Sequence, residues 1–224
     1  MIELMSSLPL ELRVARHAAL ADPARLGVVD LLTLGDLSPQ DLGERVGVAS
    51  NLLSHHLKVL ETAGLIERRR SEGDGRRGYV RLIPESLPAE ARDAEVSAHR
   101  VVFVCTANSA RSQLAEHLWR ARTSVAAASA GTLPADGVAP GAVAVATAHG
   151  LDLSHAVPKT LDQIARPDDL RITVCDRARE SLASTGLHWS IPDPVRLGTP
   201  QAFEAAFDEI SHRIDALLPH VRAA

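Results

Sequence analysis

The sequence has only two cysteines and no long apolar run, and each scarcity limits what the chain can be. The two thiols, Cys105 and Cys175, allow at most one disulfide. No apolar run approaches the roughly 20 residues that span a bilayer. The first 20 residues, MIELMSSLPLELRVARHAAL, lack the basic start and compact apolar core of a secretory signal. We therefore expect a cytoplasmic protein with no membrane segment and with both thiols reduced.

The sequence also lacks a strong excess of charge of either sign. The formal net charge of -4 at pH 7 gives no global attraction to nucleic acid, so any DNA contact has to come from a local basic patch. Hydrophobic residues make up 46% and charged residues 23% of the chain, an ordinary globular composition. A length of 224 residues allows two modest domains or one large one.

Residues 84–98, PESLPAEARDAEVSA, separate two halves of different pattern. This stretch has two prolines, four acids and few large apolar residues, which is typical of a linker. We therefore predict a first domain over 1–83 and a second over 99–224. In the second, strand-like and helical stretches alternate, which predicts an α/β fold with a parallel sheet covered by helices. The expected elements are strands at 101–105, 124–132 and 171–175, and helices at 112–122, 140–149 and near 200–219.

The first half contains three short helical patterns with clear start signals. Asp22-Pro23 and Ser38-Pro39 each place a capping residue before a proline at the first helical position. A third helix, at about 50–62, follows after a tight turn, which is the helix-turn-helix arrangement whose second helix enters the major groove. The predicted buried stripe of that helix is Leu53, Leu57 and Leu60. The opposite face offers the candidate DNA contacts Ser50, Asn51, Ser54, His55 and Lys58.

A basic hairpin follows the helices. In LIERRRSEGDGRRGYVRL, residues 65–82, two strand-like arms flank the turn-forming EGDG. Six arginines lie between Arg68 and Arg81, and such a hairpin after a helix-turn-helix is a wing, whose tip lies along phosphates or the minor groove. The alternatives are a small helical domain of another kind and arginines that only solvate a surface. The candidate wing contacts are Arg69, Arg70, Arg76 and Arg77.

Residues 10–82 resemble the arsenic-responsive repressor (ArsR) family of winged-helix regulators, and LSHHLKVLETAGLI is the most specific piece. The resemblance implies a homodimer that binds an inverted repeat in double-stranded DNA and leaves it when a metalloid or metal binds. Because no cysteine precedes Cys105, thiolate capture of arsenite within this domain is excluded. His55 and His56 point in different directions from one helix, so we expect base or phosphate contact for His55 and packing for His56. No metal-ligand spacing is present.

The stretch VVFVCTANSARSQLAEHLW, residues 101–119, places a thiol between a strand and a helix. A thiolate nucleophile needs positive potential, which successive loop amides and a helix N-terminus supply. Arg111 adds a planar fork that grips two oxygens of a tetrahedral anion. We expect Asn108 to hold the loop's curvature and Ser112 to donate to the sulfur; the alternative is a buried structural cysteine. The predicted oxyanion-binding residues are Thr106, Ala107, Asn108, Ser109, Ala110, Arg111 and Ser112.

From about residue 100 to 219 the chain resembles the low-molecular-weight phosphatase fold and, within it, the arsenate reductases. CTANSARS matches the anion loop, SAGT at 129–132 a strand end, and Asp193-Pro194 the acid loop. The resemblance implies that Asp193 is the general acid. Two departures favour a reductase: no aromatic residue follows Asp193-Pro194 to stack on a phenol ring, and Gln113 stands where phosphatases commonly have proline.

Cys175 ends another predicted strand, on the side of a parallel sheet where ligands bind. Reductases of this fold served by thioredoxin use a third cysteine several residues later, and DRARESLASTGLHW has none. Our hypothesis is that Cys105 forms a thiol–arsenate adduct, and that Cys175 or a small thiol such as mycothiol or glutathione attacks its sulfur. An external thiol or redoxin completes the cycle, with no bound cofactor. Alternatively, Cys175 is a buried strand-end thiol with no part in the reaction.

Two rival functions remain open. In one, the second domain is a phosphatase for small phosphomonoesters. In the other, the chain is a transcription regulator whose second domain senses an oxyanion or the thiol state. The first interpretation, a fusion of an ArsR-like regulator with an arsenate reductase, makes Cys105, Arg111, Asp193 and Cys175 the catalytic candidates.

Overall fold

The computed structural model describes residues 9–83, 96–182 and 186–223. Its contacts divide the chain into two compact units. The first comprises Met1–Arg69 and Gly78–Ala94, and the second comprises Arg70–Arg77 and Glu95–Ala224. The predicted linker lies largely outside the described residues, and the predicted boundaries at 83 and 99 stay predictions. The short segment Arg70–Arg77 is grouped with the second unit, away from its neighbours in sequence.

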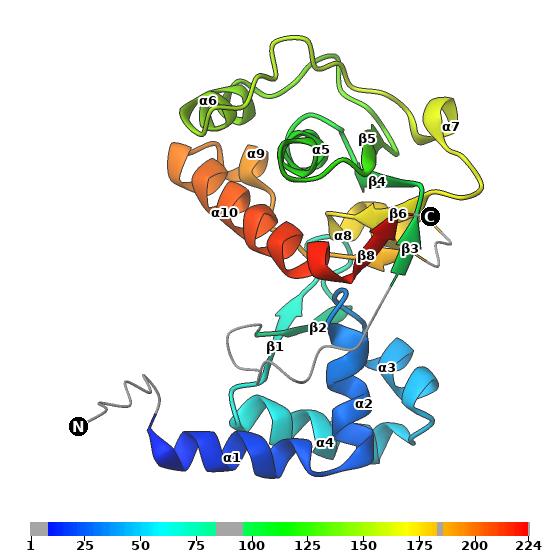
Figure 1. Cartoon of the computed structure of the whole chain (residues 1–224), viewed down its shortest axis with the longest axis vertical. Helices are drawn as coiled ribbons and strands as arrows, with labels where there is room; N and C mark the ends of the chain where they lie inside the picture. The colour runs from blue at the N-terminus through cyan, green and yellow to red at the C-terminus, as the bar shows by residue number, and fades with distance from the viewer. Residues whose placement is uncertain (1–8, 84–95, 183–185, 224) are drawn as a thin grey trace. The chain divides into compact units, whose positions relative to one another are not determined.

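In its described residues, the first unit is built on four helices, two of which start at the caps that the sequence predicts. The helices are α1 (Leu10–Leu20), α2 (Pro23–Leu32), α3 (Pro39–Val46) and α4 (Ser50–Thr62) (Figure 1). The Asp22 side chain accepts from the backbone N–H of Arg25, and Ser38 accepts from that of Asp41, which confirms both predicted caps. Helix α3 ends at Gly47, whose φ of 73° is left-handed and suits a glycine.

The core of the first unit lies between these helices and the strands that follow. Leu53, Leu57 and Leu60 of α4 are all buried, which confirms the predicted stripe. Strands β1 (Ile66–Arg70) and β2 (Gly78–Leu82) form the predicted two-stranded hairpin. Leu37 and Val80 exchange backbone hydrogen bonds of 3.1 and 2.8 Å, which joins the stretch before α3 to β2. The helical part and the hairpin therefore share one core.

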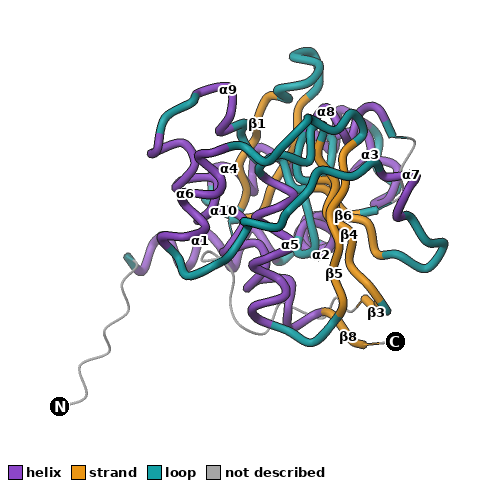
Figure 2. Tube along the Cα trace, turned by 90° about the horizontal axis from the view of Figure 1, so that it is seen from above, coloured by secondary structure: helices purple, strands orange, loops and turns teal. Residues whose placement is uncertain are grey.

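The second unit contains the predicted parallel sheet, in the order β5-β4-β6-β7. Its strands are β4 (Arg100–Cys105), β5 (Ala126–Gly131), β6 (Leu170–Thr173) and β7 (Leu187–His188), and neighbouring pairs are all parallel. Figure 2 shows β4, β5 and β6 running side by side. Strand β4 is central, and its last five residues are buried, as the run VVFVC predicts. Residues 96–98, which we assigned to the linker, form β3 (Val96–Ala98) and pair in parallel with β8 (Val221–Ala223).

Helices cover the sheet of the second unit. They are α5 (Arg111–Arg122), α6 (Pro140–Ala148), α7 (Leu161–Ile164), α8 (Asp176–Ser181), α9 (Pro194–Leu197) and α10 (Pro200–Leu217), and the 3₁₀ turn η2 (Leu218–His220) follows α10. Helix α5 packs on β4 and β5, and α10 packs on α5 and α6. In the core, Phe103 of β4 contacts Trp119 and Trp189, with ring centroids 5.9 and 5.8 Å away.

Within the described residues, no helix is both long and apolar enough to cross a membrane. The same part of the chain has no group of three or more His, Cys, Asp or Glu side chains placed to hold a metal ion.

Candidate active site

The predicted anion loop, residues 105–111, joins the end of β4 to the start of α5. Its carbonyl groups are bonded outward: those of residues 105, 106, 107 and 109 accept from the amides of residues 132, 133, 135 and 139 at 2.8–3.1 Å. Since the C=O and the next N–H of a peptide unit point in opposite directions, the amides that follow these carbonyls face the other way. The loop packs on Gly131, where an added Cβ would lie 2.6 Å from the Thr106 carbonyl oxygen. The strand end therefore needs glycine to seat the loop.

Cys105 lies at the bottom of this loop and receives hydrogen bonds at its sulfur. The backbone N–H of Asn108 donates to Cys105 Sγ at 3.1 Å, and Ser112 Oγ lies 3.0 Å from the same sulfur. Because Asn108 Nδ2 donates to Ser112 Oγ at 2.8 Å, the Ser112 hydroxyl has its own proton to give to the sulfur. Two donors and the start of α5 thus favour a negatively charged sulfur.

Asn108 holds the curvature of the loop, as we predicted. It is a non-glycine residue with positive φ, 49°, among the described residues. Its buried side-chain amide uses all of its hydrogen-bonding capacity: Nδ2 donates to Ser112 and Ser129 at 2.8 and 2.9 Å. The oxygen Oδ1 accepts from the Lys159 backbone N–H at 2.8 Å and from Gln113 Nε2 at 3.2 Å. The cost of the left-handed backbone is therefore offset by four buried hydrogen bonds.

Arg111 and Asp193 face each other across the site. Arg111 Nη1 donates to the carbonyl oxygen of Ile191 at 2.8 Å, and Nη2 lies 3.1 Å from Asp193 Oδ2. The first contact fixes the plane of the guanidinium, and the second brings the predicted acid to the group that would grip an anion. Asp193 also caps α9 by accepting from the backbone N–H of Val195. An oxygen held by Arg111 would thus lie within reach of the Asp193 carboxyl group.

Cys175 lies beside the same loop, after β6 and at the N-cap of α8. Its sulfur is 3.4 Å from Thr106 Oγ1 and accepts from the Ala178 N–H at 3.4 Å. Both cysteines are buried and free. Burial raises the pKa of the Cys175 thiol, negative charge on Cys105 raises it further, and Arg111 opposes both effects. Cys175 is therefore a neutral thiol at neutral pH.

Sequence reasoning missed Asp176 and its contact with His188. Asp176 is buried, and its Oδ1 lies 3.2 Å from His188 Nε2, while His188 Nδ1 lies 2.9 Å from Thr173 Oγ1. The pKa of Asp176 is below its ordinary value: burial raises it, but hydrogen bonds from His188, Glu72 and Ser190 outweigh that effect. The only signal in the sequence is an acid at the start of a helix, directly after the second cysteine.

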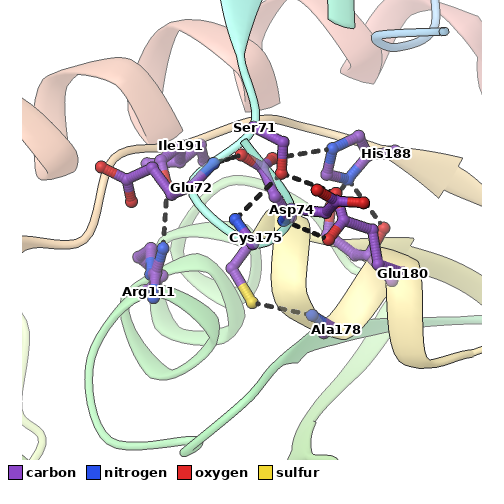
Figure 3. Close-up of polar contacts among 12 residues, drawn as sticks. Ser71, Glu72, Asp74, Arg111, Cys175, Ala178, Glu180, His188 and Ile191 are labelled. Carbon is purple, nitrogen blue, oxygen red and sulfur yellow. Dashed lines mark hydrogen bonds and ion pairs between the residues drawn. The ribbon is translucent and has the colours of Figure 1, made fainter. Parts of the chain in front are cut away.

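Sequence reasoning predicted the hairpin loop, which we define as residues 71–75, but missed its contacts with the oxyanion site. The backbone N–H of Glu72 donates to Asp176 Oδ2 at 2.7 Å. The Glu72 carboxylate accepts from the Asp193 N–H at 2.9 Å and from Arg196 Nη2 at 3.0 Å. On the other side, Glu180 accepts from the Ser71 hydroxyl at 2.6 Å and from the Asp74 N–H at 2.7 Å (Figure 3). These contacts join positions more than 100 residues apart, and no local pattern signals them.

The predicted DNA-contacting residues of α4 lie together on one exposed face: Ser50, Asn51, Ser54, His55 and Lys58 are all exposed. His56 is buried, as we predicted, with its ring nitrogen 3.7 Å from Asp22. Of the hairpin arginines, Arg69 pairs with Glu67 at 2.8 Å and Arg77 lies 3.9 Å from Asp74. The remaining two candidates, Arg70 and Arg76, are exposed.

A buried thiol in a loop of inward amides, faced by a guanidinium and a carboxyl group, defines the class of proteins that bind a tetrahedral oxyanion against a cysteine. Residues 100–224 match the family model "Low molecular weight phosphotyrosine protein phosphatase", and this is more than half of the chain. The chain belongs to this family.

Several relatives of this part of the chain are arsenate reductases. An arsenate reductase of Halalkalibacterium halodurans is 35% identical over 128 residues, which cover 51% of this chain and 91% of the relative. An arsenate reductase of Brevibacillus brevis is 34% identical over 122 residues, which cover 51% and 90%. A solved arsenate reductase structure from Archaeoglobus fulgidus is 31% identical, covers 53% of this chain and 98% of that chain, and has a TM-score of 0.47.

The first half has relatives of a different kind. Residues 22–77 match the MarR family model, which indicates a regulator-type helix-turn-helix region. The transcriptional repressor SdpR of Bacillus subtilis is 36% identical over 52 residues, which cover 23% of this chain and 58% of that protein. The narrower ArsR assignment stays a prediction.

Proposed function

We propose that the second half of the chain reduces arsenate to arsenite through Cys105, Cys175 and an external thiol or redoxin. The observation that carries this proposal is the second thiol: Cys175 lies beside the anion loop, 3.4 Å from the Thr106 hydroxyl, in the same site as Cys105. Phosphate ester hydrolysis needs one cysteine. Arsenate reduction also needs a second thiol, which attacks the Cys105 sulfur and releases arsenite from the adduct. The reductase names of the two bacterial relatives support the same conclusion.

The first step is attack of the Cys105 thiolate on arsenic. The loop amides and Arg111 hold the anion's oxygens, and Asp193 gives a proton to the oxygen that departs as water. A sulfur–arsenic(V) bond forms and one arsenic–oxygen bond breaks, with no change in oxidation state. Ser112 and the Asn108 N–H, which hydrogen-bond to the sulfur, stabilise it as the nucleophile.

The second step is attack of a thiolate on the Cys105 sulfur. The electron pair of the sulfur–arsenic bond goes to arsenic, which leaves as arsenite, and a disulfide remains. Cys175 is kept neutral by burial and by the charge on Cys105. Formation of the sulfur–arsenic bond removes the thiolate charge from Cys105, which is one of the two causes of the raised pKa of Cys175. An external dithiol or small thiol then reduces the disulfide.

We infer that the first half is a winged-helix DNA-binding region of ArsR type that acts as a homodimer on an inverted repeat. The exposed polar face of α4 and the exposed hairpin arginines support this proposal. Because its described helices and hairpin contain no cysteine, a thiolate sensor for arsenite within it is excluded.

The test is arsenite production from arsenate by the purified protein, with thioredoxin–thioredoxin reductase, glutathione–glutaredoxin and mycothiol–mycoredoxin systems supplied one at a time. We expect turnover with at least one system and none in Cys105→Ser. Aryl phosphate hydrolysis is measured in parallel. Hydrolysis without any arsenite would replace the reductase by the phosphatase alternative, which the family membership and the Cys105–Arg111–Asp193 set also allow.

The variant Cys175→Ser tests whether the second thiol is Cys175 or an external thiol. If Cys175 is the attacking group, the variant loses turnover with thioredoxin and accumulates a Cys105-bound adduct that mass spectrometry detects. Full turnover with a small-thiol system would show instead that the external thiol attacks Cys105 directly.

A further inference from the structure

We propose that the hairpin loop, residues 71–75, is an autoinhibitory gate on the oxyanion site, and that duplex DNA opens it by binding Arg76 and Arg77, which directly follow the loop. This proposal rests on the proposed function for the identity of the site's ligand, a tetrahedral oxyanion, and for DNA binding by the first half. The loop belongs to the second unit through its own contacts. The proposal rests on three observations: the grip on the loop, the position of Glu72, and the size of the space that remains.

The grip on the loop is made from two sides. On one side Glu180, from α8, accepts from the Ser71 hydroxyl and the Asp74 N–H (Figure 3). On the other, Asp176 accepts from the Glu72 N–H at 2.7 Å. Gly73 lies between them so closely that an added Cβ would meet Glu180 Oε2 at 2.2 Å and the Arg177 backbone nitrogen at 3.2 Å. A side chain at this position either displaces the Glu180 carboxylate from both of its partners or lifts the loop.

Glu72 holds the acid loop in place. Its carboxylate accepts from the Asp193 N–H and from Arg196, and Asp193 in turn contacts Arg111 Nη2 at 3.1 Å. An incoming oxyanion has to take over that guanidinium, so the Asp193 carboxylate has to move aside. As long as Glu72 holds the Asp193 backbone, the acid loop cannot shift together with this carboxylate without breaking these charge-assisted hydrogen bonds.

The space left beside the second thiol is too small for the substrate. The cavity lined by Glu72, Arg111, Cys175, Asp176, Arg177, Asp193 and Arg196 has a volume of about 10 Å³. That is room for about one water molecule, not for an ion with four oxygens. The lining has three acids and three arginines, so its charges balance. Withdrawing Glu72 enlarges the mouth and leaves an excess of one positive charge, which favours entry of an anion.

The two arginines that directly follow the loop are its proposed contacts with DNA. Arg76 is exposed and Arg77 is 60% exposed at its side chain, so both are accessible to phosphates while the loop is docked. A ligand that binds the loop better when it is free shifts the equilibrium toward the open site. Duplex DNA is the expected ligand class, because two adjacent arginines at a hairpin tip are suited to phosphates.

Two glycines in the same loop provide a matched test. Gly73→Ala collides with Glu180 and Arg177, whereas an added Cβ at Gly75 meets nothing within 4 Å, so Gly75→Ala is the control. Glu180→Ala removes the grip from the opposite side. The measurements, on the full chain, are the rate of Cys105 alkylation by iodoacetamide, followed by peptide mass spectrometry, and the affinity for inorganic phosphate.

We expect Gly73→Ala and Glu180→Ala to raise the alkylation rate and the phosphate affinity by roughly tenfold, the effect of losing one charge-assisted hydrogen bond. Gly75→Ala should match the unchanged protein. If Gly73→Ala and Glu180→Ala both behave like Gly75→Ala, the gate is overturned. Cys105 alkylation and phosphate affinity are both measured without arsenate turnover. The test of the gate therefore stands even if the reductase assay fails.

The effect of DNA is tested with the duplex fragment that lies upstream of the coding sequence. We expect saturating fragment, established by gel shift, to speed Cys105 alkylation in the unchanged protein and to have little effect on Gly73→Ala, whose gate is already open. No shift, or a shift with unchanged alkylation, overturns DNA as the opener, while the glycine pair decides the gate itself.

Discussion

The outer face of α4 and the loop at 105–111 are both rich in small polar side chains, but they use them in opposite ways. On α4, Asn51 is exposed, and its Oδ1 accepts from the neighbouring Leu52 N–H. In the loop, Asn108 is fully buried, and its amide makes four hydrogen bonds to residues from three other parts of the unit. One surface keeps its polar groups available for a partner, and the other uses them to hold a shape.

The difference fits the functions that we propose for the two regions. A nucleic-acid face gains energy when water is replaced by bases and phosphates, so its groups remain solvated until then. A loop that stabilises charge in a transition state has to be organised beforehand, because reorganisation during the reaction reduces the benefit. Asparagine therefore contributes little to the structure at position 51 and a great deal at position 108.

The largest expected effect is that of Asn108→Ala. The change leaves several buried partners unsatisfied and removes support for a left-handed backbone, so the loop shifts. We expect arsenate reduction (kcat/KM) to fall roughly 100-fold, as misplacement of a reacting group by about 1 Å does. Unfolding free energy should fall by about 2–3 kcal/mol. Asn51→Ala is the matched change, and it should leave both quantities unaltered; equal effects of the two would remove the contrast.

The next effect concerns ion pairs. Arg100 donates to both oxygens of Asp169 at 2.7 Å, and the Asp169 side chain is fully buried. Burial raises the pKa of Asp169, but the hydrogen bonds from Arg100 and the Arg166 N–H outweigh it and hold that pKa below its ordinary value. Arg100→Met should lower unfolding free energy by about 3 kcal/mol, and Arg69→Met, at a partly exposed pair, by at most about 1 kcal/mol.

The sign of the pH effect follows from the lowered pKa of Asp169. The pair's stabilisation is present above the pKa of an unfolded aspartate and is lost as the pH falls through the lower pKa of the folded state. Thermal unfolding between pH 7 and pH 3 should therefore show a loss of stability in the unchanged protein that is smaller in Arg100→Met. An identical acid dependence in both would contradict the assignment.

A third effect distinguishes the two thiols. Because the pKa of Cys175 is raised, its thiolate fraction at neutral pH increases about tenfold per pH unit. Single-turnover disulfide formation after adduct formation should accelerate by that factor between pH 7 and 8. A pH-independent rate would mean that proton loss from Cys175 does not limit this step.

The smallest structural effect is expected on α4. Lys58→Ala removes one exposed charge, so unfolding free energy should change by less than about 0.5 kcal/mol. DNA affinity should fall, and the slope of its logarithm against salt should decrease by about 1, as for one lost phosphate contact. Lys58→Arg keeps the charge and should preserve the slope. An unchanged slope in Lys58→Ala would place this lysine outside the DNA contact.

How much could be predicted depended on how local each signal is. The caps at Asp22 and Ser38 act within four residues, and the structure confirms them. The anion loop was also predictable, because its thiol, Asn108 and Arg111 lie in one short stretch. Strand β3 was not, since its pairing with β8 joins positions 125 apart and overrides an acidic, linker-like composition.

Glu72 was the hardest residue of the site to predict. In sequence it is one acid in a basic hairpin, and its chemistry appears only when the chain brings it to Asp193 and Arg196. Such contacts follow from tertiary structure and leave no periodicity or spacing to detect. The same is true of Glu180, which lies in an ordinary short helix.

The bare backbone at Gly131 has one more consequence. Since the anion loop rests directly on this strand end, with 2.6 Å between the Thr106 oxygen and the site of a missing Cβ, loop and sheet move as a single body. Gentle heating should therefore produce no inactive yet intact intermediate: activity and the sheet's circular dichroism should disappear at one temperature. An engineer seeking room for bulkier oxyanions would find it by redesigning the stretch around Pro194, because the floor of the pocket admits no additional carbon.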